Sequence, residues 1–514
     1  PAKVIRVLES IDHILIAVFG GAMVYYGLLI MNMTKMSTLP ATKMPSSVLY
    51  VILPLSGLLV LLNAILVAAG QDKKIFEKDS ETMPDTTIAI AIMLGSFVLL
   101  LMARMPISFT LGISSVLTAL YLNIPLATLF QRMVSGVQSF SLLAIPFFIL
   151  AGEIMGQGGI SRRLITLANA CVGWMRGGLA QVNILASMFF GGISGSAVAD
   201  TSSIGSILIP MMTDSGYDKD FSVAVTVTSS CQGVMIPPSH NMILFAMAAG
   251  GGVSIGQLFM GGLIPGILLG VALMIITAII ARKRNYPKGR VMSLKEIWKA
   301  TKDALLGLMT CIIIVGGVIL GWFTATESAA VAVVYAFIVT FFVYREIPLR
   351  QFGDILRKSL RTIAMVMALI STASMFGWLL AYLKVPTMVT NLLLGVSDNK
   401  VVILLLINVM CLILGCIMDM GPLILILTPI LLPVATQLGM APIQFGAMLI
   451  LNLAIGLCTP PVGAALFAGC SIGRIKIEDA TKACLPFYAM MILVLMLVTF
   501  WQPLSMFVPQ LMMK

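Results

Sequence analysis

The sequence has very few charged residues for its length. Only 10% of its 514 residues are Asp, Glu, Lys or Arg, whereas 59% are hydrophobic, and His occurs twice. So little polar material cannot cover the surface of a water-soluble globule of this size. Long polar stretches are also missing, and apolar runs of about 20 residues, the length of a membrane-crossing helix, recur along nearly the whole chain. The sequence therefore predicts an all-α polytopic membrane protein with no soluble domain.

The sequence also lacks a metal-ligand spacing among its cysteines. All eight lie in or beside apolar segments, which predicts free buried thiols. The net charge of +11 has the sign that nucleic acid attracts. The basic residues, however, gather in short loops, as in the cytoplasmic loops of membrane proteins, so we expect no nucleic-acid partner. The chain begins without Met or a signal-peptide pattern, from which we expect that its natural start is missing.

Short basic loops give the apolar segments an orientation. The loop from Arg282 to Lys299 holds seven basic residues and one acidic residue, which predicts that it lies in the cytoplasm. Counting from this loop, the segment 178–212 enters and leaves the membrane from the cytoplasmic side, because Gly and Asp residues interrupt its apolar run. By the same count, 400–435 enters and leaves from the outside. The sequence therefore predicts two re-entrant hairpins that face opposite ways.

Each predicted hairpin is followed by a membrane helix with a proline pair inside it, at 220–247 and at 443–468. GlyValMetIleProPro at 233–238 in the first helix recurs as GlyLeuCysThrProPro at 456–461 in the second. A proline pair removes two amide donors and breaks the helix. Two broken helices in matching positions indicate a carrier whose binding site lies at the bilayer midplane. The last span is expected at 484–512.

One sequence offset relates the two halves. Five glycine and proline pairs are separated by 223 residues, namely Pro210 and Pro433, Gly216 and Gly439, Gly233 and Gly456, Pro237 and Pro460, and Pro238 and Pro461. Chance offers an alternative, because both residue types are common in membrane helices. Their frequency does not explain the shared order of hairpin, linker and broken helix. We therefore predict an inverted-repeat secondary transporter.

The chain has a seam near residue 80. Residues 1–31 and 46–70 are predicted as two spans with basic residues at both outer ends, which places both ends in the cytoplasm. Pro84 is predicted outside, yet the six residues from Asp79 to Pro84 reach only about 20 Å, less than a hydrocarbon core of about 30 Å. We therefore expect two polypeptides written as one chain, the second starting at Met83. An ordinary linker with a weak charge bias is the alternative.

The proline breaks free backbone carbonyl groups inside the membrane. Such groups are tolerated only where they line a cavity or bind a ligand. Carbonyl oxygens of an unwound membrane helix suit sodium, and Ser239 and Thr459 add a hydroxyl beside each proline pair. The predicted sodium ligands are Gly233, Pro237, Ser239, Gly456, Thr459 and Pro461. The alternative is a structural proline kink whose polar groups are satisfied by neighbouring helices.

The hairpin tips are the candidates for binding the substrate. Small residues let the backbone approach a ligand closely, and the half-helix after each tip carries a partial positive charge at its N-terminus that suits an anion. The predicted substrate-binding residues at the tips are Ser194, Gly195, Ser196, Met420 and Gly421.

Two carboxylates lie at membrane depth beside the tips. Asp200 follows the first tip and Asp419 precedes the second, and an ionisable residue inside the membrane is a functional candidate by default. Since a carboxylate would repel an acidic substrate, we expect sodium coordination or recognition of a hydroxyl group. Structural pairing is the alternative for both. His240 adjoins the first break and fits a packing role equally well.

Three motifs resemble the large membrane subunit (M) of tripartite ATP-independent periplasmic (TRAP) transporters. They are SerGlySerAlaValAlaAsp at 194–200, GlnGlyValMetIleProProSer at 232–239 and CysThrProProValGly at 458–463. The resemblance covers roughly 84–514. Residues 1–80 resemble the last two spans of the small membrane subunit (Q) of that family.

The resemblance implies sodium-driven uptake of an organic acid, delivered by a periplasmic substrate-binding protein, across the bacterial inner membrane. It implies an elevator motion of a transport domain against a scaffold, and it adds Gln232 and Ser239, the two ends of the second motif, to the substrate-binding residues. The implied domains are 1–82 as part of the small membrane subunit and 83–514 as the large one, within which 178–247 and 400–468 form the transport domain. SerHisAsnMet at 239–242 is similar to members that handle sialic acid.

Two other function classes fit parts of the sequence. Gly192 to Gly195 match the GlyXaaSerGly nucleophile motif of rhomboid intramembrane proteases, with Ser194 as nucleophile and His240 as base. Rhomboids usually place a glycine three residues after the histidine, where this chain has Ile243, and they have no inverted repeat. A passive ion channel would not need two hairpins and two broken helices. We therefore expect a transporter and not an enzyme.

Overall fold

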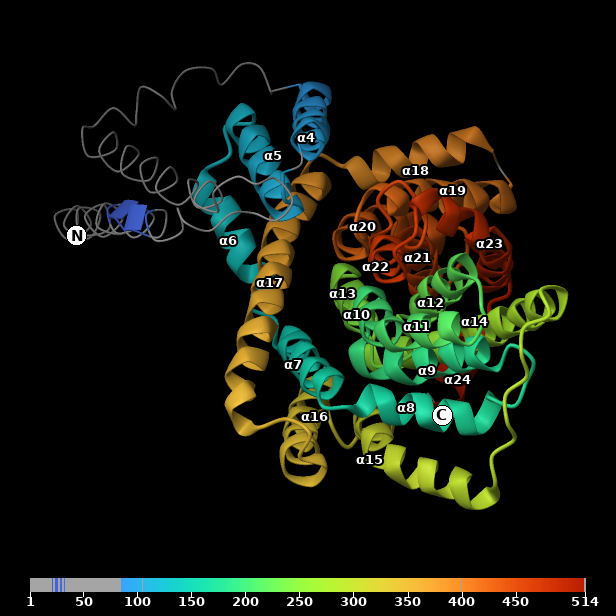
Figure 1. The fold of residues 1–514 in the computed structure, drawn as a ribbon. Coiled ribbons are helices and arrows are strands. Elements are labelled where there is room, and N and C mark those ends of the chain that lie inside the picture. Colours follow the sequence, from blue (N-terminus) through green and yellow to red (C-terminus); the bar gives the residue numbers. More distant parts are fainter. Residues whose placement is uncertain are drawn as a thin grey trace. The chain divides into compact units, whose positions relative to one another are not determined.

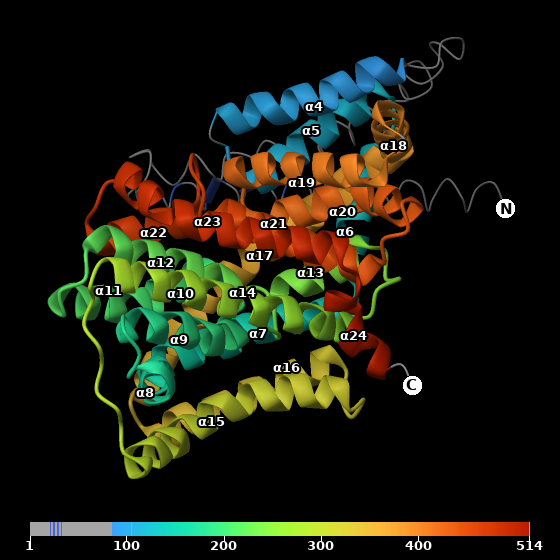
Figure 2. The same ribbon diagram turned by 90° about the vertical axis from the view of Figure 1, so that its right-hand side faces the viewer.

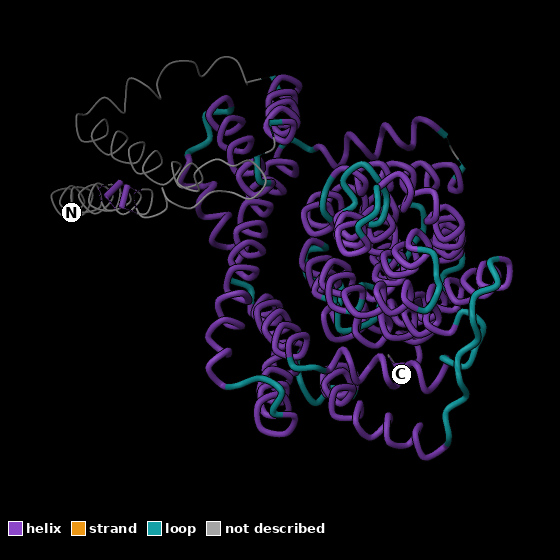
Figure 3. The backbone as a smooth tube through the Cα atoms, viewed as in Figure 1, coloured by secondary structure: helices purple, strands orange, loops and turns teal. Residues whose placement is uncertain are grey.

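The computed structural model describes residues 85–103, 105–397 and 399–512, together with six isolated positions before residue 85. The two spans predicted at 1–31 and 46–70 lie outside the described residues. From Thr86 onward the chain forms one structural unit, and every regular element in its described residues is a helix (Figure 3). The prediction of an all-α fold is confirmed for this part of the chain.

Among the described residues, eight helical segments are long and apolar enough to cross a membrane. The longest are α14 (Ile255–Lys283), α15 (Leu294–Ile319), α17 (Phe352–Tyr382) and α23 (Ile477–Phe500). The last predicted span, 484–512, has different bounds in the structure. Helix α23 ends at Phe500, and α24 (Pro503–Met512) is a separate helix, because the residue before a proline disfavours helical backbone angles.

A group of outer helices is built around one side of α17, which packs along α5, α6 and α7 (Figure 1). The other elements of this group are α4 (Thr86–Met102), α5 (Ile107–Tyr121), α6 (Leu126–Val137), η2 (Phe140–Leu143), α7 (Ala144–Gln157), α16 (Ala325–Ile338) with its π-helical extension η3 (Val339–Tyr344), and η4 (Leu349–Gln351). Helices α15 and α16 each begin with a capping box, formed by Ser293 with Glu296 and by Thr324 with Glu327.

The inner helices follow the predicted order of hairpin and broken helix twice. The first repeat consists of the hairpin α9 (Gly178–Ser194), α10 (Ala197–Ser203) and α11 (Gly205–Asp214), followed by the broken helix α12 (Lys219–Gly233) and α13 (His240–Ala248). The second repeat consists of the hairpin α19 (Lys400–Ile417) and α20 (Met420–Gln437), followed by the broken helix α21 (Pro442–Leu457) and α22 (Ala464–Gly473).

The helix boundaries repeat with the predicted offset. Helix α10 begins at Ala197 and α20 at Met420, and α12 begins at Lys219 and α21 at Pro442, in both cases 223 residues later. The broken helices run in opposite directions, since α22 packs against α12 whereas α13 packs against α20 towards the other end (Figure 2). The inverted repeat with two hairpins and two broken helices is therefore confirmed.

The two short helices that precede the hairpins were not predicted from the sequence. Helices α8 (Ile160–Val172) and α18 (Val385–Val396) precede the first and the second hairpin. Gly159 begins α8 with a φ of +71°, a left-handed conformation that glycine adopts without strain. Helix α8 mixes polar and apolar residues and α18 is apolar, but both are too short to span a membrane, so a search for spans misses them.

A charged clasp joins the α11–α12 turn to the loop after α14. The guanidinium of Arg284 lies 2.8 Å from an Asp218 oxygen and 3.3 Å from an Asp220 oxygen, and the Tyr286 hydroxyl donates to Asp218 at 2.7 Å. The hydrogen bond from Tyr286 lowers the pKa of Asp218, opposed by partial burial and assisted by Arg284. Burial raises the pKa of Tyr286 to about 12.

We expect Asp218→Asn to lower the free energy of unfolding by about 0.5–1 kcal/mol at neutral pH, since the clasp is half exposed. A carboxyl whose folded pKa is lowered stabilises the protein above its unfolded pKa, which is near 3.8, and loses that effect as the pH falls through the folded value. Thermal unfolding in detergent at pH 7 and at a pH well below 3.8 tests this. If the unfolding temperatures of wild type and variant differed by the same amount at both pH values, the ionised Asp218 carboxylate would not be the source of the stability.

Candidate functional site

The tip of the first hairpin lies on the first helix break. Gly195 turns the chain with a φ of +60°, and its carbonyl accepts a hydrogen bond from the side-chain amide of Asn241 at 3.3 Å. A Cβ atom at Gly195 would lie 3.2 Å from the Nδ1 atom of His240. The structure therefore brings the predicted tip and the predicted break together. We call residues 194–196 and 233–241 the first cluster.

The second hairpin meets the second break in the same way. The amide of Val462 donates to the carbonyl of Cys416 at 3.0 Å, which ties the segment after the proline pair to the end of α19. We call residues 415–421 and 456–463 the second cluster. Each cluster thus combines a hairpin tip with the unwound segment of its own repeat, as the sequence predicts.

Glycines let each hairpin approach its broken helix at backbone distance. A Cβ atom at Gly191 would lie 2.1 Å from the Cα atom of Gly233, and one at Gly456 would lie 2.4 Å from the carbonyl carbon of Gly415. Real Cβ atoms do not come this close to a backbone, so no side chain fits at either contact. The predicted ligands Gly233 and Gly456 therefore set the spacing of helices in addition to any role in binding.

Several carbonyl oxygens at the two breaks accept no hydrogen bond from the described residues. In the first break these belong to Val234, Met235, Ile236, Pro237 and Pro238. In the second break these belong to Leu457, Pro460, Pro461 and Val462. Both proline pairs contain a cis peptide bond. Because unpaired carbonyls inside a membrane protein are costly, these oxygens are suited to a bound cation.

The hydroxyl groups beside the proline pairs differ in their bonding. The Ser239 hydroxyl is fully buried and has no hydrogen-bond partner among the described residues. The Thr459 hydroxyl donates to the carbonyl of Ile455 at 2.7 Å, which leaves its oxygen free to accept or to coordinate. The carbonyl of the neighbouring Cys458 is already used, since it accepts a hydrogen bond from Tyr488.

The two breaks also differ in exposure. Pro237 and Pro238 are buried, whereas Pro461 and Val462 are exposed. The first cluster is thus closed by surrounding helices and the second is open on one side in this conformation. Two pockets outside the clusters, of about 400 and 760 Å³, are lined mainly by outer helices and by the loop before α14.

Asp200 is the most strongly isolated charged group of the site. It lies on α10, one turn after the first tip, with 1% of its surface exposed; the Ser187 hydroxyl lies nearby, but neither carboxylate oxygen has a partner with good hydrogen-bond geometry among the described residues. A buried unpaired carboxylate costs several kcal/mol unless a cation or proton compensates it. No ion pair reaches Asp200 among the described residues, and its role in cation binding stays a prediction.

Hydroxyl and amide side chains surround α10 and were missed by the sequence analysis. Thr201 donates to Ser230 at 2.8 Å, and the Ser187 and Ser229 hydroxyls are 3.2 Å apart. Further along the same helices, Asn183 donates to Thr226 at 2.6 Å. The signal in the sequence is the run ThrValThrSerSer at 226–230, which is too polar for a helix that is almost entirely buried.

Gln232 does not join the first tip. Its amide donates to the carbonyl of Ile184 at 2.7 Å, and that residue precedes Ser194 by ten positions, about 15 Å along α9. Its side-chain oxygen lies against Gly270 of α14, where a Cβ atom would be 2.7 Å away. The position of this side chain fits packing between α9 and α14 better than the predicted contact with substrate.

The second tip contributes one exposed carboxylate. Asp419 precedes α20, and its side chain is exposed and makes no capping hydrogen bond. Met420 is buried, and a Cβ atom at Gly421 would contact Leu244 of α13 at 3.8 Å. The second tip therefore lies beside the second half of the first broken helix, so the two clusters meet through α13 and α20.

Ser194 and His240 do not form a catalytic pair in this structure. The Ser194 hydroxyl accepts a hydrogen bond from the amide of Ser196 at 3.4 Å, and Ser196 accepts one from the amide of Ala199 at 3.4 Å. No hydrogen bond joins Ser194 to His240 among the described residues. The serines of the tip thus stabilise the turn into α10.

Two family models match the chain. Residues 94–504 match the family described as "Tripartite ATP-independent periplasmic transporter, DctM component". Residues 1–73 match the family described as "Tripartite ATP-independent periplasmic transporters, DctQ component". The two matches lie on either side of the seam predicted near residue 80.

Similar proteins are permeases or uncharacterised. The chain is 43% identical over 425 residues to the "Uncharacterized protein YgiK" of Salmonella typhimurium, covering 82% of this chain and 97% of that one. It is 38% identical to the isethionate TRAP transporter permease DctMQ of Oleidesulfovibrio alaskensis, and the match covers 93% of this chain and 77% of that one. It is 39% identical to the sialic acid TRAP transporter large permease SiaM of Vibrio cholerae, and the match covers 80% of this chain and 96% of that one.

Solved transporters share the fold at low sequence identity. The YdaH transporter of Alcanivorax borkumensis has a TM-score of 0.57 at 15% identity, and the match covers 82% of this chain and 98% of that one. MtrF of Neisseria gonorrhoeae has a TM-score of 0.54 at 12% identity, covering 82% and 96%. These likenesses concern the arrangement of helices.

Proposed function

Because this chain belongs to the tripartite ATP-independent periplasmic (TRAP) transporters, we propose that it takes up an organic acid together with sodium ions. The chain is a multi-pass protein of the bacterial inner membrane, and its relatives are named as permeases, not enzymes. The protease and channel alternatives find no support among them. The family also implies a periplasmic substrate-binding protein and a small membrane subunit as partners.

An organic acid is the substrate class that the named relatives share. Their names mention isethionate, C4-dicarboxylates, sialic acid and 2,3-diketo-L-gulonate, which are all anions at neutral pH. Sialic acid is one candidate within this class, supported by SerHisAsnMet at 239–242. The small residues of the first tip would bring backbone amides to the substrate carboxylate.

The observation that carries the sodium proposal is the pair of breaks with unpaired carbonyls. Each break lies against a hairpin tip, and each has a hydroxyl beside its prolines, at Ser239 and at Thr459. Asp200 adds a buried negative charge without a partner. Oxygen ligands and an uncompensated carboxylate are what a hard monovalent cation needs inside a membrane.

An elevator motion is the mechanism that we propose for transport. The hairpins and broken helices at 178–247 and 400–468 would move together, because they pack on one another. The outer helices would form the scaffold. Helices α8 and α18, which precede the two hairpins, would act as hinges between the scaffold and the transport domain. Gly159 at the start of α8 has the backbone freedom that such a hinge uses.

The relation between 1–82 and 83–514 stays a prediction. We proposed two polypeptides with Met83 as the second start, whereas the alignment with the isethionate permease DctMQ extends over 93% of this chain. That alignment favours a single polypeptide. Mass determination of the protein purified from its native membrane distinguishes the two arrangements.

Reconstituted vesicles test the proposed function. We expect uptake of a labelled acid only with an inward sodium gradient and a loaded binding protein, with sialate, isethionate and succinate tested in parallel. Accumulation above the outside concentration is the decisive readout. Flux that only runs downhill and ignores sodium would contradict the proposal and favour a channel. Peptide cleavage that depends on Ser194 would favour a protease.

Thr459→Val is expected to raise the sodium concentration for half-maximal uptake by roughly tenfold, since one oxygen ligand is lost without a change in shape. The matched control is Thr436→Val on α20, whose hydroxyl also donates to the carbonyl four residues earlier but is exposed. This control should keep the wild-type sodium dependence. The sodium assignment of Thr459 is wrong if both variants behave alike.

A further inference from the structure

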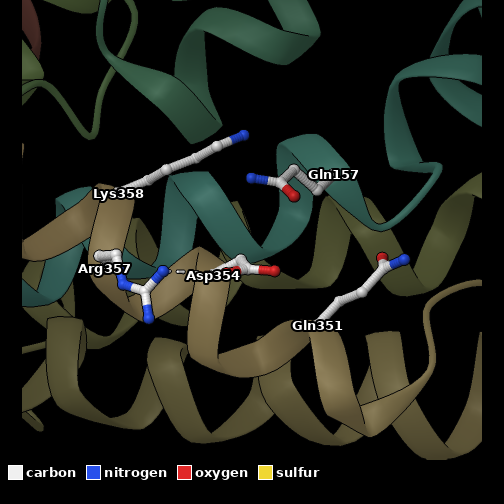
Figure 4. Close-up of a pocket in the computed structure, with 5 residues that line it drawn as sticks. All are labelled: Gln157, Gln351, Asp354, Arg357 and Lys358. Atoms are coloured by element: carbon white, nitrogen blue, oxygen red, sulfur yellow. Dashed lines mark ion pairs between the residues drawn. The ribbon is translucent and has the colours of Figure 1, made fainter.

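A pocket of about 400 Å³ lies where α17 begins, far along the chain from either cluster. It is lined by Gln157 at the end of α7, Gln351 of η4, and Asp354, Arg357 and Lys358 of α17 (Figure 4). Figure 4 shows Lys358 and Gln157 on one side of this space and the ion pair of Arg357 with Asp354 on the other. Polar side chains from two separate parts of the chain thus face one opening.

The charge around this pocket is strongly positive. Between residues 345 and 361 the chain has five basic and two acidic residues. Glu346 is held by Arg163 of α8 at 2.6 Å, and Asp354 lies 3.6 Å from Arg357. Lys358 has no ion pair among the described residues, and neither do Arg350 and Arg361. Glu153 is the other nearby acid, and it accepts a hydrogen bond from Gln157.

The pocket is expected at the inner surface of the membrane. Helix α17 has 31 residues, so it is about 46 Å long and exceeds a hydrocarbon core of about 30 Å. The positive-inside rule places its basic first turns on the cytoplasmic side. The pocket is therefore expected at the depth of the headgroups of the inner leaflet.

We propose that this pocket binds the phosphate headgroup of an anionic phospholipid of the inner leaflet. Lys358 would hold the phosphate together with Arg357, which would turn from Asp354 to do so, and Gln157 and Gln351 would donate to its oxygens. A soluble phosphate compound would use the same cations, but the place of the pocket at the expected cytoplasmic end of a membrane helix favours a lipid headgroup. The inference does not depend on the proposed transport function.

Lipid retention in native mass spectrometry tests the proposal. The purified full chain is incubated with phosphatidylglycerol or phosphatidylcholine in mild detergent, as wild type and as the double variant Arg357→Gln, Lys358→Gln. We expect phosphatidylglycerol to be retained by wild type and to be lost roughly tenfold or more readily by the variant, since each cation near a lipid surface contributes to anion binding. Phosphatidylcholine should not distinguish the two proteins.

The control variant Lys295→Gln, Lys299→Gln removes two exposed basic residues from α15, also on the predicted cytoplasmic side but outside the pocket. It should retain phosphatidylglycerol like wild type, and all three proteins should unfold at the same temperature. Equal loss in both double variants would overturn the pocket as a specific site. Displacement of the lipid by inorganic phosphate alone, with equal binding of phosphate in lipid-free protein, would overturn the lipid assignment.

Discussion

Asp200→Asn is expected to reduce sodium-driven uptake by roughly 100-fold or more while the protein keeps its fold. The carboxylate is buried on α10 without a hydrogen-bond partner among the described residues, so its charge is available to a cation. The amide has nearly the same shape but no charge, and losing a charge-assisted interaction costs about 3 kcal/mol. Uptake into vesicles under a sodium gradient measures the loss.

The same variant has a second readout that a merely structural role would not give. Wild-type protein should unfold at a higher temperature when sodium is added, because an ion that binds only the folded state stabilises it. Asp200→Asn should lose this sodium-dependent increase, and without sodium it should be at least as stable as wild type, since a buried unpaired charge is removed. A lower unfolding temperature in sodium-free buffer would show that Asp200 serves packing instead.

Asp214→Asn is the matched control. Asp214 lies at the end of α11 in the same hairpin, but its side chain is exposed. The substitution makes the same chemical change outside the buried site, so uptake and sodium-dependent stability should both stay close to wild type. Loss of uptake in both variants would point to the net charge of the hairpin and would contradict the site assignment.

Gly191→Ala is expected to destabilise the folded state by several kcal/mol and to abolish uptake. Its Cβ atom would lie 2.1 Å from the Cα atom of Gly233 and 2.7 Å from that residue's carbonyl oxygen, and both atoms are backbone. No rotamer change relieves such an overlap, so α9 and α12 would have to separate and lose packing over their whole contact. Gly456→Ala should have the same effect through Gly415 in the second repeat.

Helix glycines in open positions provide the control for this prediction. Gly316 of α15 and Gly377 of α17 have nothing within 4 Å of an added Cβ atom. Alanine there should be neutral or stabilise by about 0.5–1 kcal/mol, since it lowers the backbone entropy of the unfolded chain. Thermal unfolding and the yield of monodisperse protein compare the four variants. Gly191→Ala with the stability of Gly377→Ala would refute the close-packing account.

The repeat could be predicted from the sequence because it depends on local chemistry. Pro237 and Pro460 break their helices wherever they are placed, since proline has no amide hydrogen and clashes with the preceding turn. The offset of 223 residues between Lys219 and Pro442 then appears directly in the helix boundaries. The tips at Gly195 and near Met420 follow from the same kind of local signal, a flexible or capping residue between apolar runs.

Other parts of the site depend on partners far away in the sequence. Gln232 was predicted to bind substrate from its motif, but its side-chain amide donates to the carbonyl of Ile184 and its side-chain oxygen lies against Gly270 of α14. The hydroxyls of Ser229 and Ser230 became part of the site only through Ser187 and Thr201 of the hairpin. In each case the residue type shows that the side chain can form a hydrogen bond. The packing of α9, α10 and α12 determines which residue is its partner.

The sequence by itself determined the class of protein, the membrane segments, the two breaks and their opposite directions. Hydropathy, charge in the loops and proline chemistry act over a few residues, so these properties are independent of how the helices pack. Only the tertiary structure decided that Asp200 is unpaired, that Gly191 and Gly456 meet other backbones, and which carbonyls remain free. Burial and hydrogen bonding are relations between distant residues, and they exist only after the helices have packed.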